Sequence, residues 1–274
     1  MIDMHIHSNY SDGKLTPFEI IDRCIINNVN KISITDHDTL DAYNNELFKY
    51  SKNNNIELIT GVEISTKYNN IGIHVLGYNI DINNKKLKNK LNKLRNARHD
   101  YLCKVASKLK ELGYIIDTDY LDTIESVTKA HIALNIIENK NNFNLLNNVF
   151  GHIPNKGEFI ETIMNEGCPA YVKKESITPK KASKLIKEAH GKVILAHPVA
   201  YTYEDNLTEK DILEIIKTMN IDGIESNYIY IDKNNIKHND INKWNEFANK
   251  YNLETSTGSD FHEYDGIHPD IGLK

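Results

Sequence analysis

The 274-residue sequence has few cysteines and no long apolar segment. Cys24, Cys103 and Cys168 form neither an even set nor a Cys-x-x-Cys pair, which is typical of proteins in a reducing compartment. No apolar run approaches the length of a membrane span, and Asp3 and His5 interrupt the N-terminus before a signal-peptide core could form. We therefore expect a cytoplasmic protein without a membrane partner.

The sequence also contains no internal repeat, no low-complexity linker and no Gly-x-Ser-x-Gly nucleophile motif. Its length suits one large domain, or a domain with a substantial insert, and is sufficient to bury a core. Hydrophobic residues make up 40% and charged residues 26%, as in ordinary globular proteins. The formal net charge of −5 excludes a protein that coats nucleic acid over its whole surface, while a local basic patch stays compatible.

Short apolar segments alternate with amphipathic segments in two parts of the chain. Seven apolar segments are predicted strands: 2–7, 31–35, 56–64, 72–78, 192–197, 222–225 and 253–259. Five segments with helical periodicity are predicted helices between or after them: 17–28, 40–52, 179–190, 209–219 and 236–251. Alternating strands and helices indicate a parallel sheet covered by helices, so the predicted fold class is α/β.

The segment 83–172 differs because it contains helical patterns and no convincing strand. Three helices are predicted in it: 85–112, 127–137 and 156–164. We expect this segment to be an inserted helical cap for substrate recognition. Residues 1–82 and 173–274 would then form the main domain.

The first predicted helix of the cap is strongly basic. Between Lys85 and Lys110 it has ten Lys or Arg residues and one acid, Asp100, which gives a local charge of about +9. A solvated lysine face explains most of this charge. Arg95 and Arg98 are two of only three arginines in the chain, and a guanidinium group suits bidentate contact with phosphate.

His5 and His7 lie two residues apart in the first predicted strand. Side chains at positions i and i+2 of a strand point to the same face, so Asp3 shares that face with both histidines. A His-x-His pair is common in proteins and does not by itself establish a metal site. Such a site needs further ligands from other strands.

Nine His, Asp and Glu residues lie at or near the ends of predicted strands: His5, His7, Asp12, His37, Glu63, His74, His197, Asp260 and His262. Ligand sites of parallel α/β sheets lie at the carboxyl ends of the strands. Mixed imidazole and carboxylate ligands suit Zn²⁺, Mn²⁺ or Fe²⁺, and nine ligands suit two or three ions that share a carboxylate. Singly, each residue has a structural explanation, such as a turn at Asp12-Gly13. Their joint occurrence favours a metal site.

Six motifs resemble, in order, those of the PHP (polymerase and histidinol phosphatase) family. They are Asp-Met-His-Ile-His-Ser…Ser-Asp-Gly (3–13), Thr-Asp-His-Asp (35–38), Gly-Val-Glu-Ile-Ser (61–65), His-Val-Leu-Gly-Tyr (74–78), Ala-His-Pro (196–198) and Gly-Ser-Asp-Phe-His (258–262). Within the family, the sequence is most similar to nucleoside 3′,5′-bisphosphate phosphatases and 5′→3′ oligoribonucleases. The resemblance implies a distorted (β/α)7 barrel of seven strands that holds a trinuclear metal site.

The resemblance also implies a distribution of ligands over three ions. The first ion would be held by His5, His7, Glu63 and Asp260. The second would share Glu63 and add His74 and His197, and the third would be held by Asp12, His37 and His262. Catalytic roles are expected for Glu63, His197 and His262. Asp3 is expected to fix the tautomer of an imidazole, and Gly13 to turn the chain so that Asp12 reaches back over the strand end.

The predicted function is hydrolysis of a phosphate ester. Two or three divalent ions of manganese, zinc or iron are expected, and the attacking group would be a hydroxide that bridges two of them. The implied substrate is a nucleoside 3′,5′-bisphosphate, which loses its 3′-phosphate, or a short 5′-phosphorylated RNA. In the cap, Arg98 and Lys129 are predicted to bind a substrate phosphate. The family pattern has arginine at the second position, and Lys129 keeps the charge without the bidentate geometry. No stable protein partner is predicted.

Three other functions stay open. A histidinol-phosphate-type or other small-molecule phosphomonoesterase would use the same metal site. An amidohydrolase-type barrel also begins with His-x-His, but it needs a metal-bridging lysine, and no lysine lies at a suitable predicted strand end. A non-catalytic PHP module that binds nucleic acid would have lost ligand residues, and none of the nine is missing.

Overall fold

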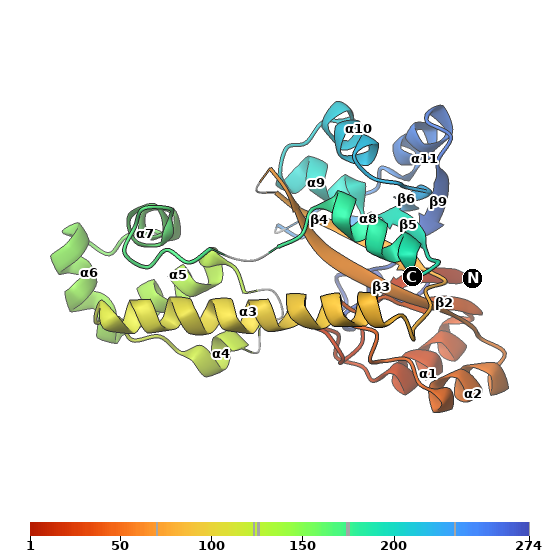
Figure 1. Cartoon of the computed structure of the whole chain (residues 1–274), viewed down its shortest axis with the longest axis horizontal. Coiled ribbons are helices and arrows are strands. Elements are labelled where there is room, and N and C mark those ends of the chain that lie inside the picture. Colours follow the sequence, from red (N-terminus) through yellow and green to blue (C-terminus); the bar gives the residue numbers. More distant parts are fainter. Residues whose placement is uncertain (70, 123, 125–126, 174–175, 233, 274) are drawn as a thin grey trace. The chain divides into compact units, whose positions relative to one another are not determined.

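The computed structural model describes residues 1–69, 71–122, 124, 127–173, 176–232 and 234–273 (Figure 1). The chain divides into two compact units. Unit 1 consists of Met1–Asn92 and Ser176–Lys274, and unit 2 of Lys93–Glu175. The insert predicted from the sequence spans 83–172, whereas unit 2 begins ten residues later and ends three residues later.

Unit 1 is built on a seven-stranded sheet with the strand order β1-β2-β3-β4-β5-β6-β9. The strands are β1 (Ile2–Ile6), β2 (Lys31–Ile34), β3 (Glu57–Tyr68), β4 (Ile71–Tyr78), β5 (Lys192–Leu195), β6 (Gly223–Asn227) and β9 (Glu254–Thr257). Most neighbours are parallel, but β4 is antiparallel to both β3 and β5. The prediction of a fully parallel sheet is therefore wrong at β4. Only two residues separate β3 from β4, too few for the crossover that parallel strands need.

The two end strands of this sheet, β1 and β9, approach each other through the segment that follows β9. The amide of His7 donates to the carbonyl of Phe261 at 2.9 Å, and the amide of Asp260 donates to the carbonyl of His5 at 2.8 Å. Among the described residues, one isolated parallel bridge joins Ile6 to Phe261 here, and β1 and β9 do not pair in a ladder. The α/β fold is confirmed, whereas the closed barrel expected from the resemblance is not.

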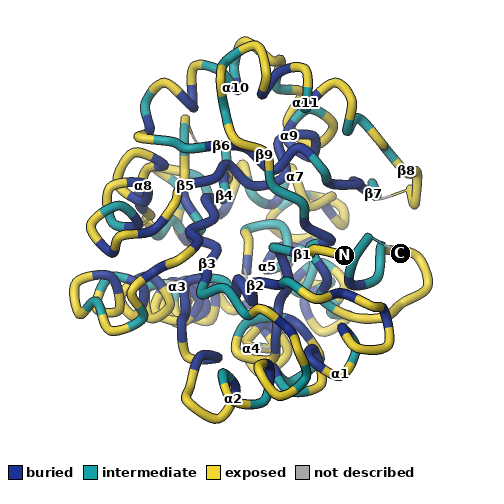
Figure 2. Tube along the Cα trace, turned by 90° about the vertical axis from the view of Figure 1, so that its right-hand side faces the viewer, coloured by how far each residue is buried: buried dark blue, intermediate teal, exposed yellow. Residues whose placement is uncertain are grey.

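Helices cover the sheet of unit 1, and in Figure 2 the buried strands lie inside a ring of half-exposed helices. The helices are α1 (Pro17–Asn27), α2 (Asn45–Asn53), α8 (Pro179–Glu188), α9 (Pro198–Glu204), α10 (Glu209–Lys217) and α11 (Ile241–Lys250). Helix α1 shows why the sequence forms them. Thr16 and Glu19 make a capping box at its start, Pro17 occupies the first turn, and Ile20 and Ile21 are buried.

A second, two-stranded sheet in unit 1 was not predicted. Strands β7 (Tyr230–Ile231) and β8 (Lys237–His238) pair in antiparallel orientation. Each has only two residues, which is too short for an alternating pattern to show in the sequence.

Unit 2 is helical in its described residues and has a hydrophobic core of its own. Helix α3 (Lys85–Glu111) starts in unit 1 and continues into unit 2. The other elements are α4 (Thr118–Asp122), α5 (Lys129–Glu138), η1 (Lys140–Asn142), α6 (Phe143–Phe150), α7 (Lys156–Phe159) and the π-helical turn η2 (Ile160–Met164). Leu109, Ile132 and Phe159 are fully buried among them. Within the described part of the chain, no helix is both long and apolar enough to span a membrane.

Candidate metal centre

Four of the predicted ligands converge at the end of β1. His5 and His7 are completely buried, and their Nε2 atoms lie 3.1 Å apart. Oε2 of Glu63 lies 3.2 Å from both nitrogens, and Oδ1 of Asp260 lies 3.2 Å from the first and 3.1 Å from the second. The four ligand atoms lie close enough together to hold one cation. This group is the one that the resemblance implies for the first ion.

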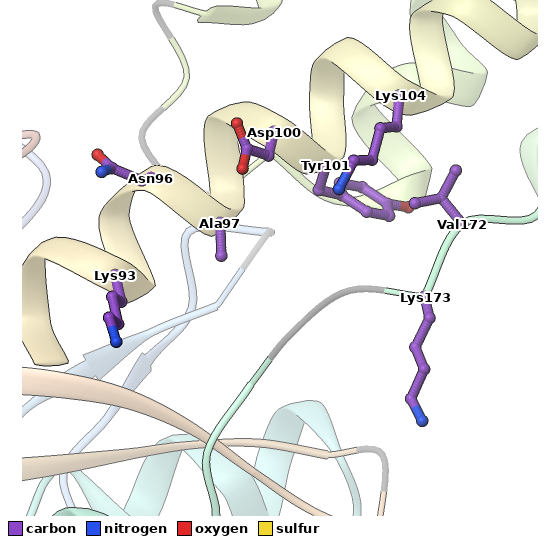
Figure 3. A pocket seen from close by; sticks show the side chains of 8 residues that line it. All are labelled: Lys93, Asn96, Ala97, Asp100, Tyr101, Lys104, Val172 and Lys173. Carbon is purple, nitrogen blue, oxygen red and sulfur yellow. The ribbon is translucent and has the colours of Figure 1, made fainter.

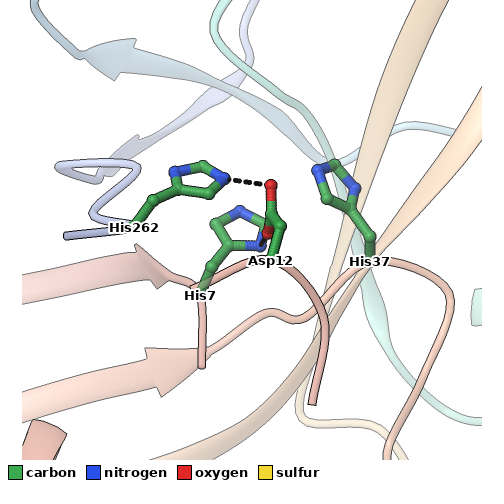
Figure 4. Close-up of side chains that lie close together, drawn as sticks. All are labelled: His7, Asp12, His37 and His262. Carbon is green, nitrogen blue, oxygen red and sulfur yellow. Dashed lines mark ion pairs between the residues drawn. The ribbon is translucent and has the colours of Figure 1, made fainter. Parts of the chain in front are cut away.

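A second group surrounds the loop after β1 and is shown in Figure 4. Nε2 of His262 contacts Oδ2 of Asp12 at 2.8 Å, and Nδ1 of His7 contacts Oδ1 of the same carboxylate at 3.4 Å. The imidazoles of His7 and His262 stack with their centres 4.2 Å apart. His37 completes a ligand-spaced set with these three residues. The structure thus brings together the ligands implied for the third ion and adds His7 to them.

The carboxylate of Glu63 joins the remaining histidines. Its Oε1 lies 3.0 Å from Nδ1 of His74 and 3.3 Å from Nε2 of His197, and its Oε2 lies 3.1 Å from Nδ1 of His37. The ligand-spaced group around Glu63 and His74 contains His37. The resemblance instead implies His197 as the partner of His74. Among the described residues, the contact that links His197 to the other ligands is the one between its Nε2 and Oε1 of Glu63.

The position of Glu63 in the sheet differs from the prediction. Glu63 and His74 lie in the middle of β3 and β4 rather than at strand ends. Pairing of β2 with β3 stops at Thr60, and β3 continues beyond it, so that Glu63 forms a bridge with His37 just after the end of β2. The long β3–β4 pair therefore carries both ligands to the level where the shorter strands end.

A compact loop presents Asp12 to the centre. The hydroxyls of Ser8 and Ser11 each donate to the buried carboxylate of Asp36 at 2.6 Å. At Gly13, a Cβ would lie 2.2 Å from the carbonyl oxygen of His7, closer than any real side chain permits. The loop can close in this way because position 13 is glycine.

Three residues of this region have a positive φ. His197 has φ 25°, Asp260 has φ 55° and Asp38 has φ 51°. Residues with a Cβ rarely adopt this left-handed region, at a cost of about 1–3 kcal/mol each. Strain of this kind persists where surrounding contacts hold it and concentrates at functional sites.

Burial and mutual charge shift the acid–base properties of the cluster. Burial would lower the pKa of His5, but neighbouring carboxylates, Glu225 first, outweigh burial and hold this pKa well above its usual value. Burial would raise the pKa of Glu63, but the surrounding imidazoles, His37 first, hold it well below its usual value. Burial lowers the pKa of His37 well below its usual value, against the attraction of Glu63. The cluster therefore favours a bound positive charge.

The donor set fits divalent metal ions. Oε2 of Glu63 is buried and accepts no hydrogen bond, although three imidazole nitrogens lie within 3.2 Å of it. A buried carboxylate oxygen without a donor is costly, and a cation held jointly with these nitrogens would remove the cost. Imidazole and carboxylate together are ligands of Zn²⁺, Mn²⁺ and Fe²⁺.

Glu225 is a residue of the site that the sequence analysis missed. It lies on β6, is fully buried, and both of its oxygens lie 3.1 Å from Nδ1 of His5. The signal for it was a carboxylate inside a segment predicted as a buried strand. The role predicted for Asp3 is wrong, because its carboxylate accepts from the backbone amides of His5, Ser259 and Gly272 instead of from an imidazole.

The predicted substrate residues belong to unit 2. The side chain of Arg98 lies outside the described part of the structure. Lys129 begins α5, donates from Nζ to Oδ1 of Asn165 at 2.9 Å, and lies 5.9 Å from the ring centre of Tyr171.

Unit 2 also has a hollow of about 240 Å³ on the side of α3, shown in Figure 3. Lys93, Lys104 and Lys173 line it together with one acid, Asp100. Lys129 does not line this hollow. Among the described side chains, Lys129 and the hollow are thus separate basic features of unit 2.

Comparison with known proteins extends over nearly the whole chain. The model of a family described as PHP domain matches residues 3–197. A 5′-3′ exoribonuclease of Haemophilus influenzae is 31% identical over 262 residues, which cover 95% of this chain and 89% of the relative. A 3′,5′-nucleoside bisphosphate phosphatase of Chromobacterium violaceum is 26% identical over 265 residues, 95% of this chain and 87% of the relative. A solved structure from the same organism, described as an amidohydrolase with bound sulfate and no metal, has a TM-score of 0.68 at 25% identity, covering 97% of this chain and 89% of the other.

Proposed function

The chain belongs to the PHP domain family and is a metal-dependent phosphoesterase, and from this premise we propose that its substrates are nucleotides. The substrate is either a nucleoside 3′,5′-bisphosphate, from which the 3′-phosphate is removed, or a short 5′-phosphorylated RNA. The observation that carries the proposal is the clustering of Glu63 with eight further imidazole and carboxylate side chains, in a chain similar throughout to proteins named for these two substrates.

We assign the ligands to two or three manganese, zinc or iron ions. His5, His7, Glu63 and Asp260 would hold the first ion, and Asp12, His37 and His262 would hold another. His74 and His197 would join Glu63 at a further position. When bound, such ions activate water near neutral pH and offset the charge of a phosphate ester.

The protein side chains decide from which side a substrate phosphate can approach. His5, His7 and Glu63 are buried, whereas the side chains of Asp12, His74 and His262 remain 24%, 32% and 33% exposed. The phosphate therefore enters over the exposed three. We assign Glu63 as the carboxylate that keeps the metal positions together, and we assign His197, which contacts it, and His262, which contacts Asp12, as further catalytic residues.

Unit 2 supplies basic groups for the rest of the substrate. Lys129 keeps a positive charge beside Tyr171, an arrangement that can hold a phosphate together with an aromatic group. Arg98 is part of the basic helix α3. We assign Lys129 and Arg98 to a substrate phosphate that is not hydrolysed.

A substrate panel tests the proposal. The wild-type protein, loaded in turn with Mn²⁺, Zn²⁺ or Fe²⁺, is assayed for kcat/KM on adenosine 3′,5′-bisphosphate, a 5′-phosphorylated triribonucleotide, histidinol phosphate and p-nitrophenyl phosphate. We expect one of the first two to exceed the last two by at least about tenfold, because only they carry a second phosphate or a nucleotide chain. A preference for histidinol phosphate, or equal values on all four, would reject the nucleotide assignment.

A further inference from the structure

We propose that Glu225 is a positioning residue that holds two metal-ligand histidines at once, His5 through its imidazole and His197 through its backbone. The inference rests on the metal centre assigned above and adds a residue that holds no metal itself. In this role Glu225 keeps two ligands from distant parts of the chain in fixed positions relative to each other.

The contact with His5 fixes which ring nitrogen faces the metal centre. Glu225 is fully buried, and its two oxygens lie 3.1 Å from Nδ1 of His5. An ionised carboxylate can only accept, so the proton of the neutral imidazole is held on Nδ1. Nε2 of His5, which lies 3.2 Å from both Glu63 and Asp260, is then left with its lone pair free for a cation.

The contact with His197 stabilises a strained backbone. The amide of His197 donates to Oε2 of Glu225 at 2.9 Å. His197 has φ 25° and ψ 58°, directly before Pro198 and the start of α9. Because this conformation is unfavourable for a residue with a Cβ, the buried hydrogen bond helps to keep the His197 ring, whose Nε2 is 3.3 Å from Glu63, in place. The rings of His5 and His197 lie nearly parallel, 5.8 Å apart.

The space that Glu225 occupies exists because a neighbouring residue is glycine. A Cβ at Gly258 would lie 2.2 Å from Oε1 of Glu225 and 2.3 Å from Cβ of His5. Gly258 follows β9, the strand beside β6, and directly precedes the Ser259-Asp260 pair. Any side chain at position 258 must displace Glu225, His5 or both.

Glu225→Gln tests the role while keeping the shape of the side chain. The backbone amide of His197 needs the one oxygen that the new amide group retains, which leaves the NH2 group against Nδ1 of His5. This arrangement favours the tautomer whose proton is on Nε2, which opposes metal binding. We expect the dissociation constant for Mn²⁺ or Zn²⁺, measured by competition with a chelating dye, to rise about 10–100-fold. Activity should recover at high metal concentration, and long-range ¹H–¹⁵N spectra of the metal-free protein, recorded at a pH above the raised pKa of His5, should show a changed tautomer for its neutral ring.

The matched control is Asp222→Asn, the same chemical change at the residue directly before the same strand. Asp222 accepts from Lys187 and from the amide of Val193, and contacts no proposed ligand. This control should leave metal affinity unchanged.

Three outcomes separate the explanations. A Glu225→Gln protein with wild-type metal affinity and an unchanged His5 tautomer overturns the positioning role while leaving the metal centre intact. Equal losses in Glu225→Gln and Asp222→Asn also overturn it, because the effect would then be general to the strand. A wild-type protein that binds no divalent ion overturns both this role and the metal centre.

Discussion

At the scale of single residues, Glu63 carries the most consequences. Both of its oxygens face imidazoles, and the residues around it come from β1, β4 and the segments after β2 and β5. A side chain placed in this way cannot be replaced by its neighbours, because no other carboxylate among the described residues contacts as many of the proposed ligands.

The first prediction concerns Glu63→Ala. We expect hydrolysis to fall by more than about 100-fold and bound metal to fall with it, since the change removes a ligand rather than a neighbour of a ligand. The measurement is kcat/KM together with metal content after dialysis. An active Glu63→Ala enzyme with normal metal content would reject the shared-ligand assignment.

The second prediction concerns Lys129→Ala. We expect KM for a nucleoside 3′,5′-bisphosphate to rise about tenfold, the size of one lost charge-assisted hydrogen bond, with KM for p-nitrophenyl phosphate unchanged. Lys184→Ala is the control, because Lys184 is largely exposed on α8 and its nearest acid is 4.0 Å away. If both substrates lose equally, Lys129 supports the fold of unit 2 rather than the substrate.

At the scale of secondary-structure elements, the chain end is fastened to α1. Nε and an Nη of Arg23 donate to the two oxygens of Asp270 at 2.6 and 2.8 Å, and the guanidinium also lies 4.5 Å from the ring centre of Tyr264. Burial would raise the pKa of Asp270, but hydrogen bonds from Arg23 and Asn27 outweigh it and hold this pKa below its usual value.

The third prediction follows from this pair. Because the pKa of Asp270 is lowered in the folded protein, the carboxylate contributes stability above the pKa of the unfolded chain, about 4, and loses it as the pH falls through the lower folded value. Asp270→Asn should therefore cost about 1 kcal/mol between pH 5 and 8, since part of the pair is solvent-screened. Urea unfolding at several pH values measures it, and the difference between the two proteins should shrink below about pH 4.

At the scale of the whole molecule, the proposed metal ligands and the proposed substrate residues fall in different units. All nine proposed metal ligands belong to unit 1, while Lys129 and the basic hollow belong to unit 2, which buries its own hydrophobic cluster. Metal binding should therefore stabilise unit 1 directly, and unit 2 should not gain stability from it directly.

The fourth prediction is that chelation destabilises unit 1 selectively. A metal that binds only the folded state, at a concentration of about 100 times its dissociation constant, adds about 2.7 kcal/mol to the free energy of unfolding. Removing the metal should therefore lower the Tm of unit 1 by about 5–10 °C. Hydrogen exchange measured by mass spectrometry resolves the two units. Faster exchange in β1, β3 and β4 with unchanged exchange in α5 is expected, and equal acceleration in both units would contradict it.

The sequence by itself determined the kinds of residues in the site and their order along the chain. His5-x-His7, Asp12-Gly13 and Gly258-Ser259-Asp260 are local patterns, so their chemistry is readable without coordinates. The same holds for α1, whose capping box at Thr16 and buried Ile20 and Ile21 depend on contacts within a few residues.

Only the tertiary structure decided how these pieces meet, because the deciding contacts join residues far apart in the chain. Glu225 and His5 are 220 residues apart, and nothing near Glu225 in the sequence identifies its partner. His197 reaches Oε1 of Glu63 from 134 residues further along the chain, directly after β5, so its place in the centre depends on the pairing of β5 with β4. Local sequence specifies donors and acceptors, whereas burial and strand register decide which of them face one another.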